Sequence, residues 1–221
     1  MGPGPGPCDV TPNPEGRPNI ATELHELDAA SPGRRSGASR AVLWLVDRSR
    51  ITPNAVTIIG FLGICAAAGL ALGRQWVAAS LVFIASGLVD SLDGLLARYQ
   101  NRVTAFGAFL DSTLDRLAEG VIIGAIGITF AQDGNIWGLA ACFVALTASF
   151  IVSYARARAE GLGIPGSSAG LMGRPERLVI VGAALFLGSV GDVLPVGMAV
   201  LAGLSLMTAG HRILLVHRAT R

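Results

Sequence analysis

Four aspartates carry most of the chemistry that this sequence can support. Asp90 and Asp93 lie in the segment VDSLDGLLAR, and Asp111 and Asp115 lie in the segment GAFLDSTLDR. Residues three and four apart share one face of a helix, so each segment would present its two carboxylates together. Carboxylate oxygens are the ligands that hard divalent cations prefer. The spacing therefore predicts two acidic helix faces that can bind metal.

The surroundings of these aspartates are apolar. Of the 221 residues, 52% are hydrophobic and only 14% are charged, whereas soluble domains are roughly a quarter charged. Carboxylates beside lipid are costly unless a cation neutralises them, and two metal ions about 4 Å apart can clamp a phosphate group during its displacement. The alternative is that the aspartates form structural salt bridges with Arg98, Arg102 and Arg116. A net charge of +2 gives no support for a nucleic-acid partner.

Six apolar stretches are candidates to cross the roughly 30 Å of hydrocarbon in a bilayer. They cover residues 51–73, 75–98, 103–131, 134–155, 175–191 and 194–216, and the fifth is the shortest. A short turn between the second and third would make these two helices antiparallel neighbours, so their acidic faces can meet. The sequence thus predicts an all-α integral membrane protein with six transmembrane helices.

The segments before the first span differ in character. Residues 38–51 read as a short amphipathic helix at the membrane surface, with Trp44 in the interface. Residues 1–36 are rich in Gly and Pro, and we predict that they are disordered. This leaves residues 37–218 as one transmembrane domain.

The arginines are distributed unevenly between the predicted loops. Nearly all of them fall on the side that also holds the aspartates and both chain termini, while the other side has Arg74, Asp133 and Asp192. Cytoplasmic loops of membrane proteins carry an excess of basic residues. We therefore expect a multi-pass protein of the cell (inner) membrane, with its termini and its active site in the cytoplasm.

The aspartates belong to a longer pattern. The sequence D-x2-D-G-x2-A-R-x8-G-x3-D-x3-D runs from Asp90 to Asp115 without a departure. It resembles the complete signature of the CDP-alcohol phosphotransferases, and the likeness extends over residues 38–218. These enzymes transfer a phosphate-linked group from a CDP-linked donor to an alcohol and release CMP.

The resemblance implies roles for individual residues. It implies two divalent ions per subunit, Mg²⁺ or Mn²⁺, at Asp90, Asp93, Asp111 and Asp115, with Asp115 as the general base. It implies a CDP-lipid site that contains Gly94, Ala97, Arg98 and Gly107, and less directly Asn54 and Thr57. It also implies a homodimer.

The acceptor is predicted from the second half of the chain. Arg156, Arg177 and Arg212 lie at the same end of three predicted helices, with Arg174 beside Pro175. Guanidinium groups bind phosphate oxygens in pairs, so these four arginines are candidates for a clamp on the acceptor's phosphate. The alternative is that they anchor helix ends at the cytoplasmic surface. Glu119 could support the metal site or pair with Arg116, and the sequence does not decide.

The segments SYARARAE, RPER and LPVGM resemble the phosphatidylinositol-phosphate synthases of actinobacteria. This implies transfer of a phosphatidyl group from CDP-diacylglycerol to inositol phosphate, giving phosphatidylinositol phosphate and CMP. Glycerol 3-phosphate is the alternative acceptor. A membrane transporter is the alternative of a different class, but the acids gather at one face and do not line a path across the membrane. An inactive relative that serves as a scaffold would not need all the signature aspartates.

Overall fold

The computed structural model describes residues 52–99, 104–164 and 172–220, and for residues 92–99 it describes the backbone but not the side chains. All of these residues belong to one compact unit, residues 42–221. The predicted amphipathic helix at 38–51 and the predicted tail at 1–36 lie outside the described residues.

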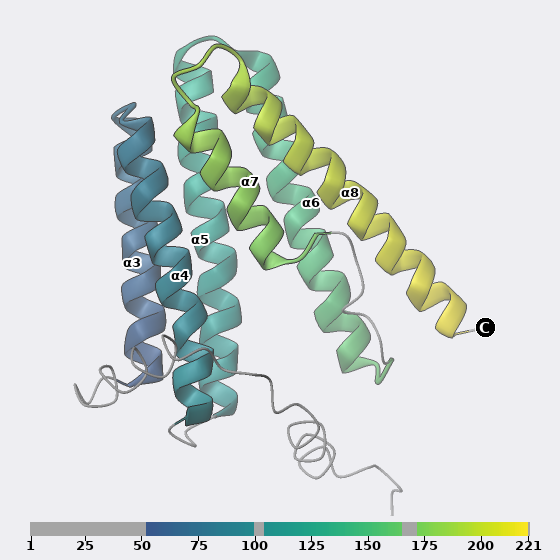
Figure 1. The fold of residues 1–221 in the computed structure, drawn as a ribbon. Helices are drawn as coiled ribbons and strands as arrows, with labels where there is room; N and C mark the ends of the chain where they lie inside the picture. The colour runs from purple at the N-terminus through teal and green to yellow at the C-terminus, as the bar shows by residue number, and fades with distance from the viewer. Residues whose placement is uncertain (1–51, 100–103, 165–171, 221) are drawn as a thin grey trace, which may run out of the picture. The chain divides into compact units, whose positions relative to one another are not determined.

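The described residues form six helices and no strand. They are α3 (Pro53–Leu72), α4 (Trp76–Tyr99), α5 (Ala105–Gln132), α6 (Ile136–Gly161), α7 (Arg174–Phe186) and α8 (Val193–Ala219). The all-helical prediction is therefore confirmed, and each helix falls on one of the six apolar stretches. Successive helices run in opposite directions (Figure 1). The predicted fifth stretch is the least regular, because its helix ends at Phe186 and is followed by turns.

Polar side chains fix where the helices begin. The Thr52 hydroxyl accepts a hydrogen bond from the backbone N–H of Ala55 at 3.3 Å, and Pro53 follows at the first helical position. The Thr104 hydroxyl likewise accepts from Gly107 N at 3.0 Å at the start of α5. Such caps satisfy backbone donors that have no partner inside the helix. The starts of α3 and α5 are therefore defined at the end of the molecule that holds the aspartates.

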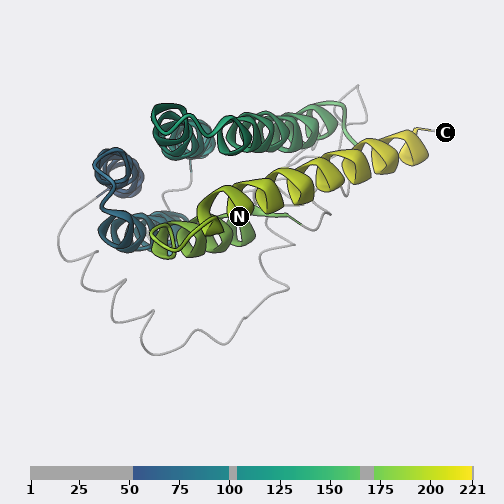
Figure 2. The same ribbon diagram turned by 90° about the horizontal axis from the view of Figure 1, so that it is seen from above.

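The six helices close into a ring. Each helix packs chiefly against two others, in the order α3, α4, α7, α8, α6, α5 and back to α3. Figure 2 shows these neighbours in end view, with α8 strongly inclined. Because α5 and α7 are not neighbours in this ring, any direct contact between their side chains has to cross its interior.

Small residues allow several of these helices to approach closely. A Cβ atom on Gly60 of α3 would lie 3.2 Å from Cβ of Asp90 on α4. Farther along, the Ser80 hydroxyl of α4 donates to the Gly182 carbonyl of α7 at 2.8 Å. Contacts of this kind are common where helices pack without large side chains between them. The glycine at position 60 therefore helps to place the Asp90 carboxylate at the α3–α4 interface.

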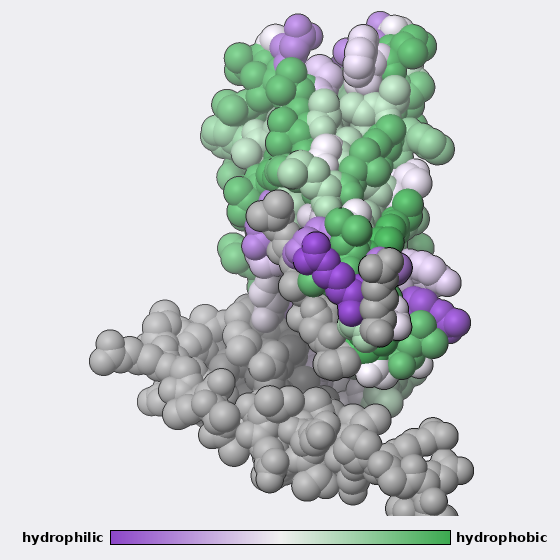
Figure 3. All heavy atoms as spheres, turned by 90° about the vertical axis from the view of Figure 1, so that its right-hand side faces the viewer, coloured by the Kyte–Doolittle hydropathy of each residue, from purple (hydrophilic) through white to green (hydrophobic). Residues whose placement is uncertain are grey.

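Among the described helices, three are long and apolar enough to cross a membrane, namely α3, α6 and α8. Helix α4 is apolar over a shorter stretch, Trp76–Ser91. On the face drawn in Figure 3, hydrophobic side chains cover most of the helical region, and hydrophilic ones gather toward its lower part and at its top edge. This distribution is that of an apolar bundle with polar ends.

At the end opposite the aspartates, an ion pair joins two turns. Arg74, between α3 and α4, donates to both carboxylate oxygens of Asp133, which follows α5, at 2.6 and 2.8 Å. The hydrogen bond from Arg74 lowers the pKa of Asp133. The pair therefore favours the folded state above the unfolded pKa of the carboxyl, and this contribution is lost as the pH falls through the lowered pKa. Both side chains are about half exposed, so the contribution is small.

Candidate active site

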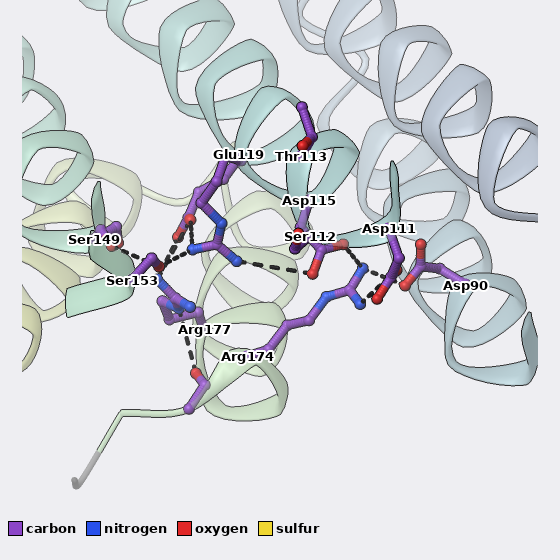
Figure 4. A network of polar contacts seen from close by, with 12 residues as sticks. Asp90, Asp111, Ser112, Thr113, Asp115, Glu119, Ser149, Ser153, Arg174 and Arg177 are labelled. Carbon is purple, nitrogen blue, oxygen red and sulfur yellow. Dashed lines mark hydrogen bonds and ion pairs between the residues drawn. The ribbon is translucent and has the colours of Figure 1, made fainter. Parts of the chain in front are cut away.

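Three of the four predicted metal ligands meet at one end of the ring. Asp90 comes from α4, and Asp111 and Asp115 come from α5 one turn apart. One carboxylate oxygen from each lies within 4.8 Å of the others. Figure 4 shows the three side chains pointing toward a common region. The side chain of Asp93 lies outside the described residues, although its backbone continues the same helix as Asp90.

Two of these carboxylates are removed from solvent. The side chains of Asp90 and Asp115 are 8% and 10% exposed, while that of Asp111 is 40% exposed. Desolvating one carboxylate costs several kcal/mol, and close like charges add to this cost. The cluster therefore requires a positive charge among its oxygens.

Arg174 supplies such a charge. Its Nη2 forms ion pairs with Oδ2 of Asp90 and, at 2.5 Å, with Oδ1 of Asp115, and its Nη1 lies 3.9 Å from Oδ1 of Asp111. The guanidinium thus enters the middle of the cluster from the first residue of α7 (Figure 4). The sequence predicted Arg174 as a ligand of the acceptor phosphate and did not predict its contacts with the aspartates.

The residues present fit a hard divalent cation. The donors are all carboxylate oxygens, which suit Mg²⁺ and Mn²⁺ rather than softer metals. These oxygens are close enough together to surround one cation, and the Arg174 guanidinium already lies among them. Because this guanidinium contacts the same oxygens that would bind a metal, the two cations compete for them.

A second cluster of charges lies one turn farther along α5. The Glu119 carboxylate accepts from Nη1 of Arg116 at 3.0 Å, and its Oε1 lies 3.1 Å from Nη1 of Arg177 on α7. Arg116 also donates to the Ser153 hydroxyl on α6, and its Nη2 lies 3.8 Å from Oδ2 of Asp115. The two clusters are therefore in contact through Arg116.

A cavity of about 60 Å³ lies beside both clusters and inside the ring. It is lined by side chains of α3, α4, α5 and α7, and its polar lining consists of Asp115, Arg116, Glu119, Arg174 and Arg177. Apolar residues form the rest of the wall. A mostly apolar lining with a few convergent charged groups has the chemistry of a ligand site, while the volume is well below the roughly 300–1,000 Å³ of most ligand pockets.

The remaining predicted acceptor residues lie on the side of α6 and α8. Arg212 is buried, and its Nη1 donates to the Val152 carbonyl at 2.8 Å. Arg156 is exposed and pairs with Glu160 at 2.8 Å. The charge of Arg212 interacts with those of both Arg156 and Arg177. Arg212 thus lies within electrostatic range of two other predicted arginines, and Arg174 is one turn from Arg177.

Two of the predicted nucleotide-site residues face each other at the mouth of the ring. A Cβ atom on Gly107 would lie 3.2 Å from Oδ1 of Asn54 and 3.0 Å from the Thr104 hydroxyl oxygen. Any larger residue at position 107 would therefore crowd the start of α3. Thr57 is buried one turn along α3 and donates to the Pro53 carbonyl at 3.2 Å. The side chains of Gly94, Ala97 and Arg98 lie outside the described residues.

Gly60 is a supporting residue that the sequence analysis does not include, although small residues at spacings of three and four along α3 (Gly60, Gly63, Ala67, Ala71) indicate a closely packed face. For Glu119 the sequence leaves two roles open, support of the metal site or pairing with Arg116. The structure shows that Glu119 pairs with Arg116 and also with Arg177. Nothing in the local sequence identifies the second partner.

Comparison with known proteins identifies the family of this chain. A profile described as CDP-alcohol phosphatidyltransferase matches residues 50–215, which is most of the chain. The chain belongs to this family. The matched range includes Asp90, Asp111 and Asp115, whose carboxylates lie close together in the structure.

Several members of the CDP-alcohol phosphatidyltransferase family are similar over most of their length. An archaetidylinositol phosphate synthase of Methanothermobacter thermautotrophicus is 47% identical over 145 residues, which cover 65% of this chain and 71% of that protein. A phosphatidylinositol phosphate synthase of Streptomyces avermitilis is 35% identical over 181 residues, covering 77% of this chain and 74% of the relative.

Solved structures of the family show the same fold. The phosphatidylinositol phosphate synthase of Mycobacterium tuberculosis with CDP-DAG bound superposes with a TM-score of 0.74 at 31% identity, covering 82% of this chain and 94% of that one. The same enzyme in complex with manganese and citrate gives a TM-score of 0.73 at 31% identity, covering 81% and 88%.

The competition between Arg174 and metal gives a test that needs no turnover. Arg174→Ala removes the guanidinium from the carboxylate oxygens, and hydrogen bonds between charged groups contribute about 1.5–3 kcal/mol. We expect the purified variant to bind Mn²⁺ roughly tenfold more tightly than the wild type, measured by electron paramagnetic resonance titration. Arg74→Ala, at the opposite end of the bundle, is the matched control and should leave Mn²⁺ affinity unchanged. Weaker or unchanged Mn²⁺ binding by Arg174→Ala would contradict the competition.

Proposed function

We propose that this protein transfers the phosphatidyl group of CDP-diacylglycerol to inositol phosphate and releases CMP. The observation that carries the proposal is the meeting of the carboxylates of Asp90, Asp111 and Asp115 with the guanidinium group of Arg174 at one end of the ring, beside a cavity that Asp115, Arg174 and Arg177 all line. Carboxylates can hold the cations that neutralise a pyrophosphate, and guanidinium groups next to them can hold an anionic acceptor. The names of the relatives differ in the lipid but share the inositol phosphate group.

The reaction forms one phosphorus–oxygen bond and breaks another. The acceptor's hydroxyl oxygen attacks the phosphorus that is attached to the lipid, the bond from this phosphorus to the CMP oxygen breaks, and the hydroxyl proton passes to a carboxylate. Asp115 is our candidate for this general base, because it lies in the cluster and lines the cavity. A divalent cation, when bound, neutralises the pyrophosphate and stabilises the charge on the departing CMP.

The metal site that we propose contains Asp90, Asp93, Asp111 and Asp115 and binds two ions per subunit, Mg²⁺ or Mn²⁺. The geometry of three of these carboxylates and the manganese in the mycobacterial relative support this proposal. For the CDP-lipid we propose a site formed by Asn54, Thr57, Gly94, Ala97, Arg98 and Gly107. The approach of Asn54 to Gly107 beside the start of α5 supports it.

For the acceptor's phosphate we propose Arg156, Arg174, Arg177 and Arg212. The positive charge of Arg212 is repelled by those of Arg156 and Arg177, and this repulsion costs energy. Nε of Arg212 is buried and has no hydrogen-bond partner among the described residues, so it can donate to a ligand. An anion that binds between them would relieve both costs. Arg174 can serve this role once a metal ion takes its place among the aspartates.

The membrane arrangement is also a proposal. We infer that α3 to α8 are six transmembrane helices, that residues 37–218 form the domain, and that residues 1–36 form a disordered tail. The excess of arginine at the aspartate end supports a cytoplasmic active site in the cell (inner) membrane. We further propose a homodimer, by likeness to the family. The grouping of the acids at one end argues against a transport path.

The acceptor is tested by turnover of the purified, reconstituted protein. With CDP-diacylglycerol and Mg²⁺, we expect inositol phosphate to give phosphatidylinositol phosphate and CMP, and free inositol to give neither, because only the former fills the arginine cluster. Labelled acceptors and thin-layer chromatography measure the lipid product. Product from glycerol 3-phosphate alone would keep the reaction and reject the acceptor. No CMP release with either phosphorylated acceptor would reject the proposed function.

The role of Asp115 as general base is tested by Asp115→Asn. Loss of a positioned general base costs about 10²–10⁴-fold in rate, and we expect kcat to fall within this range while CDP-diacylglycerol still binds in an equilibrium assay. Asp133→Asn makes the same chemical change at the other end of α5 and should leave kcat unchanged. Near-normal turnover by Asp115→Asn would show that another group accepts the proton.

A further inference from the structure

Glu119 is a largely buried carboxylate that the proposed chemistry does not use. It lies on α5 four residues beyond Asp115, and therefore on the same face of the helix, and its side chain is 13% exposed. It points away from the aspartates and toward Arg116 and Arg177 (Figure 4). A charge in this environment is stable only where partners compensate its loss of hydration.

Glu119 gives Arg177 its negative partner. The Arg177 side chain is 9% exposed, and its Nη1 lies 3.1 Å from Oε1 and 3.3 Å from Oε2 of Glu119. Its Nε donates to the Gly173 carbonyl at 3.3 Å. Among the described residues, these hydrogen bonds use Nε and Nη1, which leaves Nη2 for a further acceptor. The contacts at Nε and Nη1 therefore orient the guanidinium group of Arg177, and its Nη2 can bind a ligand.

The contact also crosses the interior of the ring. Helix α5 packs on α3 and α6, whereas α7 packs on α4 and α8. Glu119 of α5 nevertheless contacts Arg177 of α7, and both side chains line the cavity inside the ring. The same carboxylate binds Arg116, whose Nη2 lies 3.8 Å from Asp115. Glu119 thus couples the position of a guanidinium on α7 to that of a guanidinium beside the metal site.

The charges around Glu119 leave a positive excess. Arg116 and Arg177 contact it, and Arg212 interacts electrostatically with Arg177. Arg116 also lies 3.8 Å from Asp115, and Arg177 interacts with the same carboxylate. Three guanidinium groups against two carboxylates leave one positive charge, which favours an anion such as a phosphate monoester. Glu119 limits the repulsion among the guanidinium groups while this positive excess remains.

We propose that Glu119 is a positioning residue. It holds the guanidinium groups of Arg177 and Arg116 in the orientation in which they bind the acceptor's phosphate. The proposal rests on the function proposed above, in that it requires an acceptor with a phosphate group. Glu119 does not touch the reacting atoms and acts through the two arginines.

The test is the kinetic effect of Glu119→Gln, which keeps the shape of the side chain and removes its charge. We expect the KM for inositol phosphate to rise about tenfold or more, as for the loss of a hydrogen bond to a charged group. The kcat at saturating acceptor and the KM for CDP-diacylglycerol should stay near their wild-type values. A merely structural role would instead lower kcat and thermal stability without this selective change in KM.

A double-mutant cycle identifies the residue through which Glu119 acts. In an Arg177→Ala background, Glu119→Gln should raise the acceptor's KM little further, because coupled residues are not additive. The matched control is Asp133→Asn, which removes the carboxylate charge of the Asp133–Arg74 ion pair at the other end of α5. It should leave the acceptor's KM unchanged. If Glu119→Gln does not fold, Glu119→Asp keeps the charge on a shorter side chain and should give a smaller rise in the same KM.

An unchanged or lower KM for the acceptor in Glu119→Gln, or in Glu119→Asp where the former does not fold, overturns the proposal, as does full additivity with Arg177→Ala. The wild type is measured first. If it makes no product from either inositol phosphate or glycerol 3-phosphate, then the proposed function fails and the role of Glu119 fails with it. If the wild type is active and the variant has a normal acceptor KM, only the role of Glu119 fails.

Discussion

The structure depends on the cost of placing several carboxylates at the end of apolar helices. Asp90 and Asp115 are largely withdrawn from solvent, and their oxygens and that of Asp111 lie within a few ångströms of one another. Without a cation these groups would repel each other and lose their hydration. Arg174 shows that a positive group fits between them. The same requirement explains how a divalent ion and a pyrophosphate could be bound here. The positive ion neutralises the carboxylates and can also neutralise the negative pyrophosphate.

The packing of the helices in the ring positions the charged side chains that form the site. Close approach of α3 and α4 at Gly60 sets the depth of Asp90, and the start of α5 is fixed by its Thr104 cap. Helix α7 then brings Arg174 and Arg177 to the cavity that Asp115 also lines. The arginines of α7 therefore meet an acid from α4, its neighbour in the ring, and acids from α5, which lies across the interior. The region beside these groups is where two anionic substrates could meet.

Much of this arrangement could be predicted from the sequence, because it depends on the spacing of residues that are close together in the chain. The spacing of Asp111 and Asp115 places them on one face of a helix, and the small number of residues between α4 and α5 makes these helices successive in the chain, so that Asp90 can lie near them. The partners of Arg174 and Glu119 could not be predicted in the same way. The pair Glu119–Arg177 joins residues 58 positions apart, and its existence depends on how two distant helices face each other. The sequence indicated charged residues at the correct end of the bundle but could not assign their contacts.

The most direct test of the account is the location of metal in a crystal of the protein grown with Mn²⁺ and CDP-diacylglycerol. Anomalous scattering at the manganese edge should give peaks bounded by the carboxylates of Asp90, Asp93, Asp111 and Asp115, with the Arg174 guanidinium displaced from Asp90 and Asp115. A crystal that contains the liponucleotide but shows no anomalous peak among these carboxylates, with Arg174 still paired to them, would contradict the account.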